Sequence, residues 1–99
     1  MEVSLDELIE KVNSSQKTVV NYYLFAEMGV GATELELEGV HLKRDEDGYA
    51  CIPFMGEDQD NAYYLNDNNE IYQEEPDQNA RAKFEIRDGG MLLMEIYLY

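Results

Sequence analysis

The chain has 99 residues, of which 44% are hydrophobic, and its 22 acidic against 7 basic residues give a formal net charge of -15. A chain of this length has room for one core, so we expect residues 1–99 to form a single acidic domain. The apolar content argues against disorder along the whole chain. The acidity argues against direct binding to nucleic acid or to an anionic membrane.

The cysteine content and the apolar runs bear on the compartment. Cys51 is the only cysteine, so no intramolecular disulfide can form, whereas small chains in oxidising compartments usually carry several. No apolar run approaches the roughly 20 residues of a membrane span. The N-terminus lacks a basic stretch followed by an apolar one, so we expect no signal peptide. Together these features predict a cytoplasmic protein.

A short helix is predicted near the N-terminus. Ser4 and Glu7 form the Ser-x-x-Glu pattern of a capping box. Apolar residues then recur at i, i+3, i+4 and i+7, from Leu5 to Val12, which is one stripe of a helix. The pattern predicts an amphipathic helix over residues 4–13.

The next segments have the composition of strands. Residues 18–25 are rich in β-branched and aromatic side chains and favour a strand, although a helix over 20–28 stays open because apolar residues there also share a helical face. Residues 33–38 alternate between acidic and apolar after Thr33. We expect this alternation to continue to Leu42 past a bulge at Gly39.

Further strands are expected at residues 49–54, 62–65, 70–73, 82–87 and 91–99. Pro53 cannot donate to a ladder and predicts an edge position for the first of them. The Asn-rich turn 66–69 predicts a hairpin between the second and third, and Gly89-Gly90 predicts one between the last two. The final segment is apolar at nearly every residue, so we expect a central strand covered on both faces. The fold class that follows is α+β: a short N-terminal helix packed on a meandering antiparallel sheet of about five to seven strands.

Residues that could carry chemistry are sparse. His41, the only histidine, lies in an expected strand without a recognisable nucleophile motif beside it. Cys51 has apolar neighbours and is typical of a small buried residue. A Cys51–His41 pair that meets in space stays open on sequence alone. We nevertheless expect no catalytic residue, and the chain not to be an enzyme.

Metal and cofactor motifs are also missing from the sequence. One histidine and one cysteine are too few for a usual transition-metal site. Neither Asp45 nor Asp67 begins a stretch with the spacing of an EF-hand. The glycine pairs at 29–31 and 89–90 lack the Lys-Ser/Thr of a phosphate-binding loop. We therefore expect no metal and no cofactor.

The placement of acidic residues is the strongest functional signal. No Lys or Arg occurs between Asp45 and Ala80, although carboxylates are frequent there, so this half should project a coherent negative field. In a strand, neighbours in the 34–38 glutamate series would stand about 6.8 Å apart on one face, close to the spacing of successive phosphates in nucleic acid. Residues expected to bind a partner are Glu34, Glu36, Glu38, Asp58, Asp60, Asp67, Glu70 and Tyr64.

In size and acidity the chain resembles phage-encoded inhibitors of nucleases, DNA-repair enzymes or CRISPR effectors, some of which mimic DNA, and immunity proteins that neutralise nuclease toxins. The resemblance covers composition and size and brings no motif, so it assigns no residue. It implies a non-catalytic inhibitor, of anti-CRISPR or other anti-defence type, that binds a basic, nucleic-acid-handling enzyme as a monomer or homodimer. Alternatives are an immunity protein, a non-inhibitory structural or assembly module, and a small enzyme that uses His41.

Overall fold

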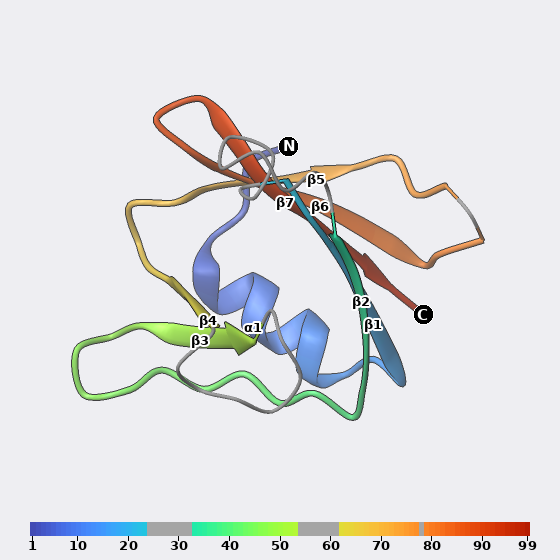
Figure 1. Cartoon of the computed structure of the whole chain (residues 1–99), viewed down its shortest axis with the longest axis horizontal. Coiled ribbons are helices and arrows are strands. Elements are labelled where there is room, and N and C mark those ends of the chain that lie inside the picture. Colours follow the sequence, from blue (N-terminus) through green and yellow to red (C-terminus); the bar gives the residue numbers. More distant parts are fainter. Residues whose placement is uncertain (24–32, 54–61, 78) are drawn as a thin grey trace.

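The computed structural model describes residues 1–23, 33–53, 62–77 and 79–99 (Figure 1). The elements are α1 (Leu5–Asn13), β1 (Lys17–Tyr22), β2 (Thr33–Glu38), β3 (Ala50–Pro53), β4 (Ala62–Leu65), β5 (Glu70–Glu74), β6 (Ala82–Asp88) and β7 (Met91–Leu98). Strands β2, β1, β7, β6 and β5 form one antiparallel sheet in this spatial order, and β3 pairs with β4 in a second sheet. The expected α+β fold, a short helix with antiparallel strands, is confirmed.

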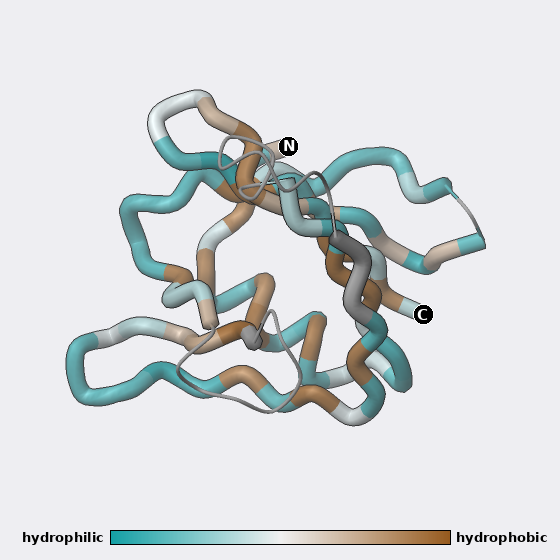
Figure 2. The backbone as a smooth tube through the Cα atoms, viewed as in Figure 1, coloured by the Kyte–Doolittle hydropathy of each residue, from teal (hydrophilic) through white to brown (hydrophobic). Residues whose placement is uncertain are grey.

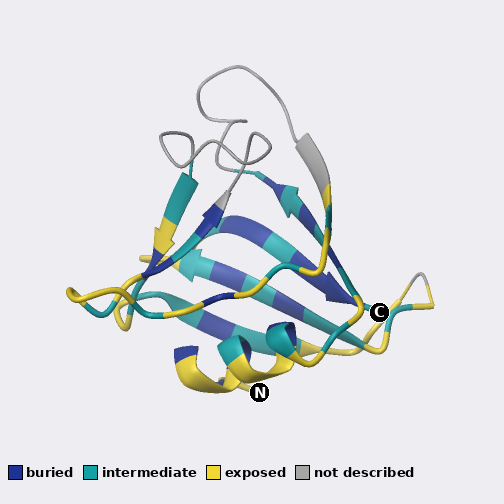
Figure 3. Cartoon of the chain, turned by 90° about the horizontal axis from the view of Figure 1, so that it is seen from below, coloured by how far each residue is buried: buried dark blue, intermediate teal, exposed yellow. Residues whose placement is uncertain are grey.

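Helix α1 begins and packs as the sequence predicts. Ser4 is the N-cap, and its Oγ accepts a hydrogen bond of 3.1 Å from the backbone N of Glu7. Leu5, Leu8 and Val12 are buried in the core, and each such burial contributes about 1.5–3 kcal/mol relative to exposure. Figure 3 shows the exposed residues of α1 along its outward side.

Strand β7 is the centre of the larger sheet, as expected. It pairs with β1 on one side and with β6 on the other. Ile96 and Leu98, which alternate to one face, are buried in the core, and Tyr97 on the opposite face is only 4% exposed. The β6–β7 hairpin turns through Gly89 and Gly90, whose φ angles of 59° and 86° suit the two-residue turns that match strand twist.

The turn 66–69 does not make the expected hairpin between residues 62–65 and 70–73. It instead connects the two sheets, because β4 pairs with β3 and β5 pairs with β6. The other edge of β5 is already occupied by the N-terminal segment: Val3 N donates to Ile71 O at 2.8 Å, and Gln73 N donates to Met1 O at 2.7 Å. No edge of β5 is left for β4.

The strand expected to run from residue 33 to Leu42 ends earlier. β2 stops at Glu38, and Gly39 takes a left-handed φ of 63°. Leu42 is buried, and its backbone N and O bond to the Asn13 side chain at 2.7 and 2.9 Å instead of to a neighbouring strand. His41 therefore lies exposed in a loop, where a strand position was expected.

The strand preferred for residues 18–25 is confirmed over its first part. β1 covers Lys17–Tyr22 with alternating burial, so the helix alternative is wrong for residues 20–22. Residues 24–32 lie outside the described part of the chain.

One core joins both sheets and the helix. Leu42, Ile52 and Leu65 belong to the same cluster of buried residues as Leu8 and Phe84. Figure 2 shows hydrophilic residues along the peripheral turns and hydrophobic ones along the inner strands. Within the described residues, no helix is both long and apolar enough to cross a membrane.

Candidate protein-binding surface

Arg44 joins three acidic segments that are distant in the sequence. Its Nε donates to Asp6 Oδ1 in α1 at 2.8 Å, and its Nη1 donates to Gly48 O in the turn 45–48 at 2.7 Å. Nη2 and Nη1 donate to the two carboxylate oxygens of Asp67 at 2.7 and 3.1 Å. These bonds, first to Asp67 and then to Asp6, raise the pKa of Arg44. The bond from Arg44 in turn lowers the pKa of Asp67.

The turn 45–48 is fixed by its own hydrogen bonds. Asp45 Oδ1 accepts from the backbone N atoms of Asp47 and Tyr49, both at 2.9 Å. Gly48 N donates to Asp45 O at 3.0 Å, and Gly48 has a φ of 85° that favours glycine. The turn therefore holds Glu46 and Asp47 at exposed positions. We call the exposed carboxylates gathered around Arg44 the acidic turn surface: Asp6, Asp45, Glu46, Asp47 and Asp67.

Two exposed tyrosines lie beside this surface. Tyr49 directly follows the turn, and Tyr64 stands in β4 opposite Cys51 of β3. Their rings are tilted by 57° with centroids 6.5 Å apart, and the residues are 43% and 45% exposed. Large apolar side chains gathered at the surface mark interaction sites, and tyrosine is enriched among residues that carry binding energy.

The small sheet has a buried face opposite Tyr64. Ala50, Ile52 and Leu65 are fully buried in the core. Since side chains alternate along a strand, these residues point inward while Tyr64 points outward. The packed face fixes the strand that carries Tyr64, so ordering its backbone adds little cost on binding.

The Cys51–His41 pair gains no support. Burial, and then the charge of Asp45, raises the pKa of the Cys51 thiol, whereas a nucleophilic cysteine has a lowered pKa. His41 is exposed in the loop, and among the described residues no hydrogen bond joins the two side chains. In that same part of the chain, no three His, Cys, Asp or Glu side chains are grouped to hold a metal ion.

The predicted glutamate row lies on edge strand β2. Glu36 and Glu38 are exposed at alternate positions. Glu36 is partly neutralised, because Lys17 Nζ lies 3.8 Å from its Oε1. Glu34 is opposite Asn21 in the register, and its side chain lies outside the described part.

Two other predicted carboxylates, those of Asp67 and Glu70, lie away from the glutamates of β2. Asp67 and Glu70 line a hollow of about 460 Å³ together with Glu2. Glu70 accepts hydrogen bonds from Gly90 N at 3.0 Å and Tyr72 Oη at 3.2 Å. β5, which begins at Glu70, and β2 are opposite edges of the larger sheet, about 19 Å apart across four strand spacings. The predicted carboxylates within the described residues therefore form two separate groups. The predicted residues Asp58 and Asp60 lie outside the described part.

Comparison of the chain with protein-family models, with curated proteins and with solved structures gave no match. The surface is accordingly interpreted from its own chemistry. Its combination of exposed carboxylates with an exposed aromatic pair suits a cationic protein surface.

Only Asp67 and Tyr64 of this surface were among the predicted partner-binding residues, and the other residues named above were not, Arg44 and Tyr49 included. Arg44 immediately precedes the acidic stretch, and a cation at the border of such a stretch is a signal for an internal ion pair. Tyr49 follows the acidic turn directly, and its place within the acidic stretch was the signal that the sequence offered, although the residue was expected only as the start of the strand 49–54.

Proposed function

We propose that this protein is a non-catalytic inhibitor that binds a basic, nucleic-acid-handling protein through the acidic turn surface and the Tyr49–Tyr64 pair. The exposed aromatic pair next to the fixed acidic turn 45–48 is the observation that carries this proposal. An arginine of the partner can place its guanidinium over a tyrosine face and be paired by a carboxylate at the same time.

The charge distribution supports a basic partner. Four of the seven basic residues are in ion pairs with carboxylates of the chain: Lys17, Arg44, Lys83 and Arg87. Seven basic residues cannot neutralise 22 acidic ones, so the chain keeps a large negative field, which speeds its encounter with a cationic surface. Carboxylates at the partner's phosphate-binding positions would exclude its nucleic acid, which makes the inhibition steric and electrostatic. We place this activity in the cytoplasm, in keeping with the single Cys51.

The first experiment identifies the partner. The tagged chain is incubated with bacterial lysate, washed at low and then moderate salt, and bound proteins are identified by mass spectrometry. We expect one basic nucleic-acid enzyme that is retained at moderate salt, displaced by DNA or RNA, and inhibited by the chain. Retention without such competition would support an exosite inhibitor or immunity protein instead. A scatter of basic proteins that washes away would contradict the proposal.

Matched variants then locate the contact. Glu46→Lys/Asp47→Lys reverses two exposed charges of the acidic turn surface. Glu74→Lys/Glu75→Lys reverses two exposed charges elsewhere and changes the net charge equally. We expect the first pair to abolish inhibition and the second to weaken it only slightly. Equal effects would show that net charge alone, and not this surface, attracts the partner.

A further inference from the structure

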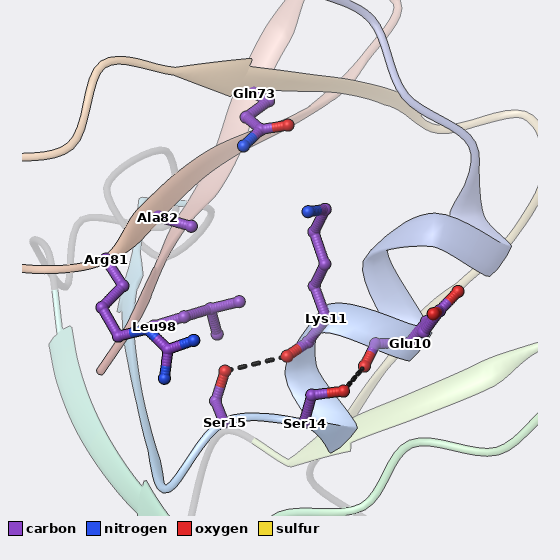
Figure 4. A pocket seen from close by; sticks show the side chains of 8 residues that line it. All are labelled: Glu10, Lys11, Ser14, Ser15, Gln73, Arg81, Ala82 and Leu98. Atoms are coloured by element: carbon purple, nitrogen blue, oxygen red, sulfur yellow. Dashed lines mark hydrogen bonds between the residues drawn. The ribbon is translucent and has the colours of Figure 1, made fainter.

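A hollow of about 330 Å³ lies between the C-terminal end of α1 and strands β5, β6 and β7. Figure 4 shows its lining side chains. Lys11 enters from the helix and Arg81 from the segment just before β6, with Gln73 of β5 on the far side. Leu98 supplies an apolar part of the lining.

The two cations in this hollow are unusual for the chain. About three acidic residues accompany each basic one, yet within the described residues neither Lys11 nor Arg81 has a side-chain hydrogen bond or ion pair. Glu10 also lines the hollow, but its carboxylate points away from both cations (Figure 4). Both side chains are exposed, so water and salt screen their repulsion in part, and an anion between them would remove it.

The surrounding groups favour an anion. The C-terminal end of a helix is negative and would repel one. Here Ser14 Oγ donates to Glu10 O and Ser15 Oγ donates to Lys11 O, both at 2.8 Å, so two carbonyls of that end are already bonded (Figure 4). The donors that remain for a ligand are the Lys11 ammonium, the Arg81 guanidinium and the Gln73 amide.

The position of Arg81 is set by the sheet. Its backbone N donates to Leu98 O at 2.8 Å, next to the start of the β6–β7 ladder. The backbone of Lys11 is fixed in the last turn of α1. Both cations therefore project from ordered backbone, which lowers the entropy cost of holding a ligand between them.

We propose that this hollow binds a small ligand through an oxyanion group, a phosphate or a carboxylate. The planar guanidinium of Arg81 can make two parallel hydrogen bonds to such a group, and Lys11 adds a point charge. This inference does not depend on the proposed function, because its ligand has the opposite charge to a basic partner and its residues are not part of the acidic turn surface.

The test uses the full chain labelled with ¹⁵N. Sodium phosphate and, separately, sodium acetate are titrated at constant ionic strength, and backbone shifts are followed. We expect saturable shifts confined to Lys11, Gln73, Arg81 and their neighbours. Arg81→Gln and Lys11→Gln should each weaken binding about tenfold, as expected for a lost charge-assisted bond. Lys43→Gln removes an exposed lysine that does not line the hollow and should leave affinity unchanged.

The two titrations also separate the sources of the oxyanion. Saturation by phosphate alone assigns a phosphate group, and saturation by acetate alone assigns a carboxylate. Shifts that do not saturate, or that persist unchanged in both Arg81→Gln and Lys11→Gln, would overturn the proposal. Unchanged spectra outside the hollow would verify that each variant is folded.

Discussion

Arg44 holds Asp67 through two parallel hydrogen bonds, from Nη2 to Oδ1 at 2.7 Å and from Nη1 to Oδ2 at 3.1 Å. Both oxygens of a carboxylate that the sequence marks for partner binding are thus already bonded within the chain. Asp67 therefore serves mainly to shape the acidic turn surface, and Glu46 and Asp47 remain the exposed groups that can meet a partner.

Arg44→Ala should lower the thermal stability, because it removes the bonds to Asp6, Gly48 and Asp67 and leaves the two carboxylates without their shared cation. Arg44→Lys should recover part of the loss, since it restores the charge but not the planar fork. Thermal unfolding at low and high salt measures both effects.

The stability that Asp67 contributes should depend on pH, because the bond from Arg44 lowers the pKa of Asp67 in the folded state. This contribution should be present above the pKa of Asp67 in the unfolded chain and vanish as the pH falls through its pKa in the folded chain. An acid titration of Asp67→Asn, which lacks the group, is the control.

Asn13→Ala should reduce the free energy of unfolding by about 2–3 kcal/mol, because both backbone groups of buried Leu42 lose their partner. Urea unfolding measures the change. Asn13→Asp keeps the acceptor for Leu42 N and loses the donor to Leu42 O, so its free energy of unfolding should lie between those of the parent and Asn13→Ala. An alanine variant as stable as the parent would show that water replaces both bonds.

Gly89→Ala should cost about 1–2 kcal/mol, because alanine is strained at the left-handed φ of 59°. An added Cβ there meets no atom within 4 Å, so the cost is one of backbone conformation and not of a clash. Gly89→Asn should cost less, since asparagine tolerates this conformation. Equal losses in the two variants, measured by urea unfolding, would contradict this explanation.

Stability should fall at high pH in part through Tyr23. The hydrogen bond that Tyr23 Oη donates to Glu95 raises the pKa of Tyr23 from 10.0 to about 12. Between these values the unfolded chain ionises Tyr23 while the folded chain does not, so this contribution is complete below pH 10 and is lost as pH rises. Lys83 makes its own bond to Glu95, which raises the pKa of Lys83. Its contribution to stability is therefore also lost as the pH rises.

Tyr23→Phe should therefore flatten the alkaline part of the stability curve, measured by urea unfolding at a series of pH values. Tyr64→Phe is the matched control, since the exposed Tyr64 side chain makes no bond to a carboxylate among the described residues. A curve for Tyr23→Phe that coincides with that of the parent would rule out this role.

Once a partner is known, charges and rings should affect binding in different ways. Glu46→Lys/Asp47→Lys should slow association and reduce its dependence on salt, because steering acts at a distance. Tyr64→Ala should mainly speed dissociation, with an affinity loss of about 30-fold if Tyr64 carries a hot spot of about 2 kcal/mol. Surface plasmon resonance at several salt concentrations separates the two rates. A change of association rate alone in Tyr64→Ala would exclude the anchoring role.

Local patterns predicted most of the secondary structure. The Ser4 cap, the helical stripe and the Gly89-Gly90 turn depend on neighbouring residues only, and all three are present. The strand pairing around the turn 66–69 was not predictable in the same way. It depends on the N-terminal residues reaching β5, and nothing near that turn in the sequence signals this pairing.

The candidate surface was less predictable than the fold for a similar reason. Tyr64 and the acidic character are visible in the sequence. The sequence does not show which carboxylates are free to bind a partner, because this depends on which of them pair with the few basic residues. Lys17 pairs with Glu36, and Arg44 pairs with Asp6 and Asp67. Both ends of such long-range pairs come together only in the folded chain.

The central position of β7 has a consequence for how the molecule assembles. Tyr23, directly after β1, is joined by a hydrogen bond to Glu95 of β7, and the two residues are 72 positions apart in the chain. While the chain is being synthesised, β1–β2 and β5–β6 can each form as separate ribbons, and the edges that later receive β7 stay open. Such edges invite pairing with other chains, and closure over this sequence separation slows folding. The larger sheet can therefore be completed only once β7 has been made, and a chain that stops before Met91 lacks the strand that joins β1 to β6.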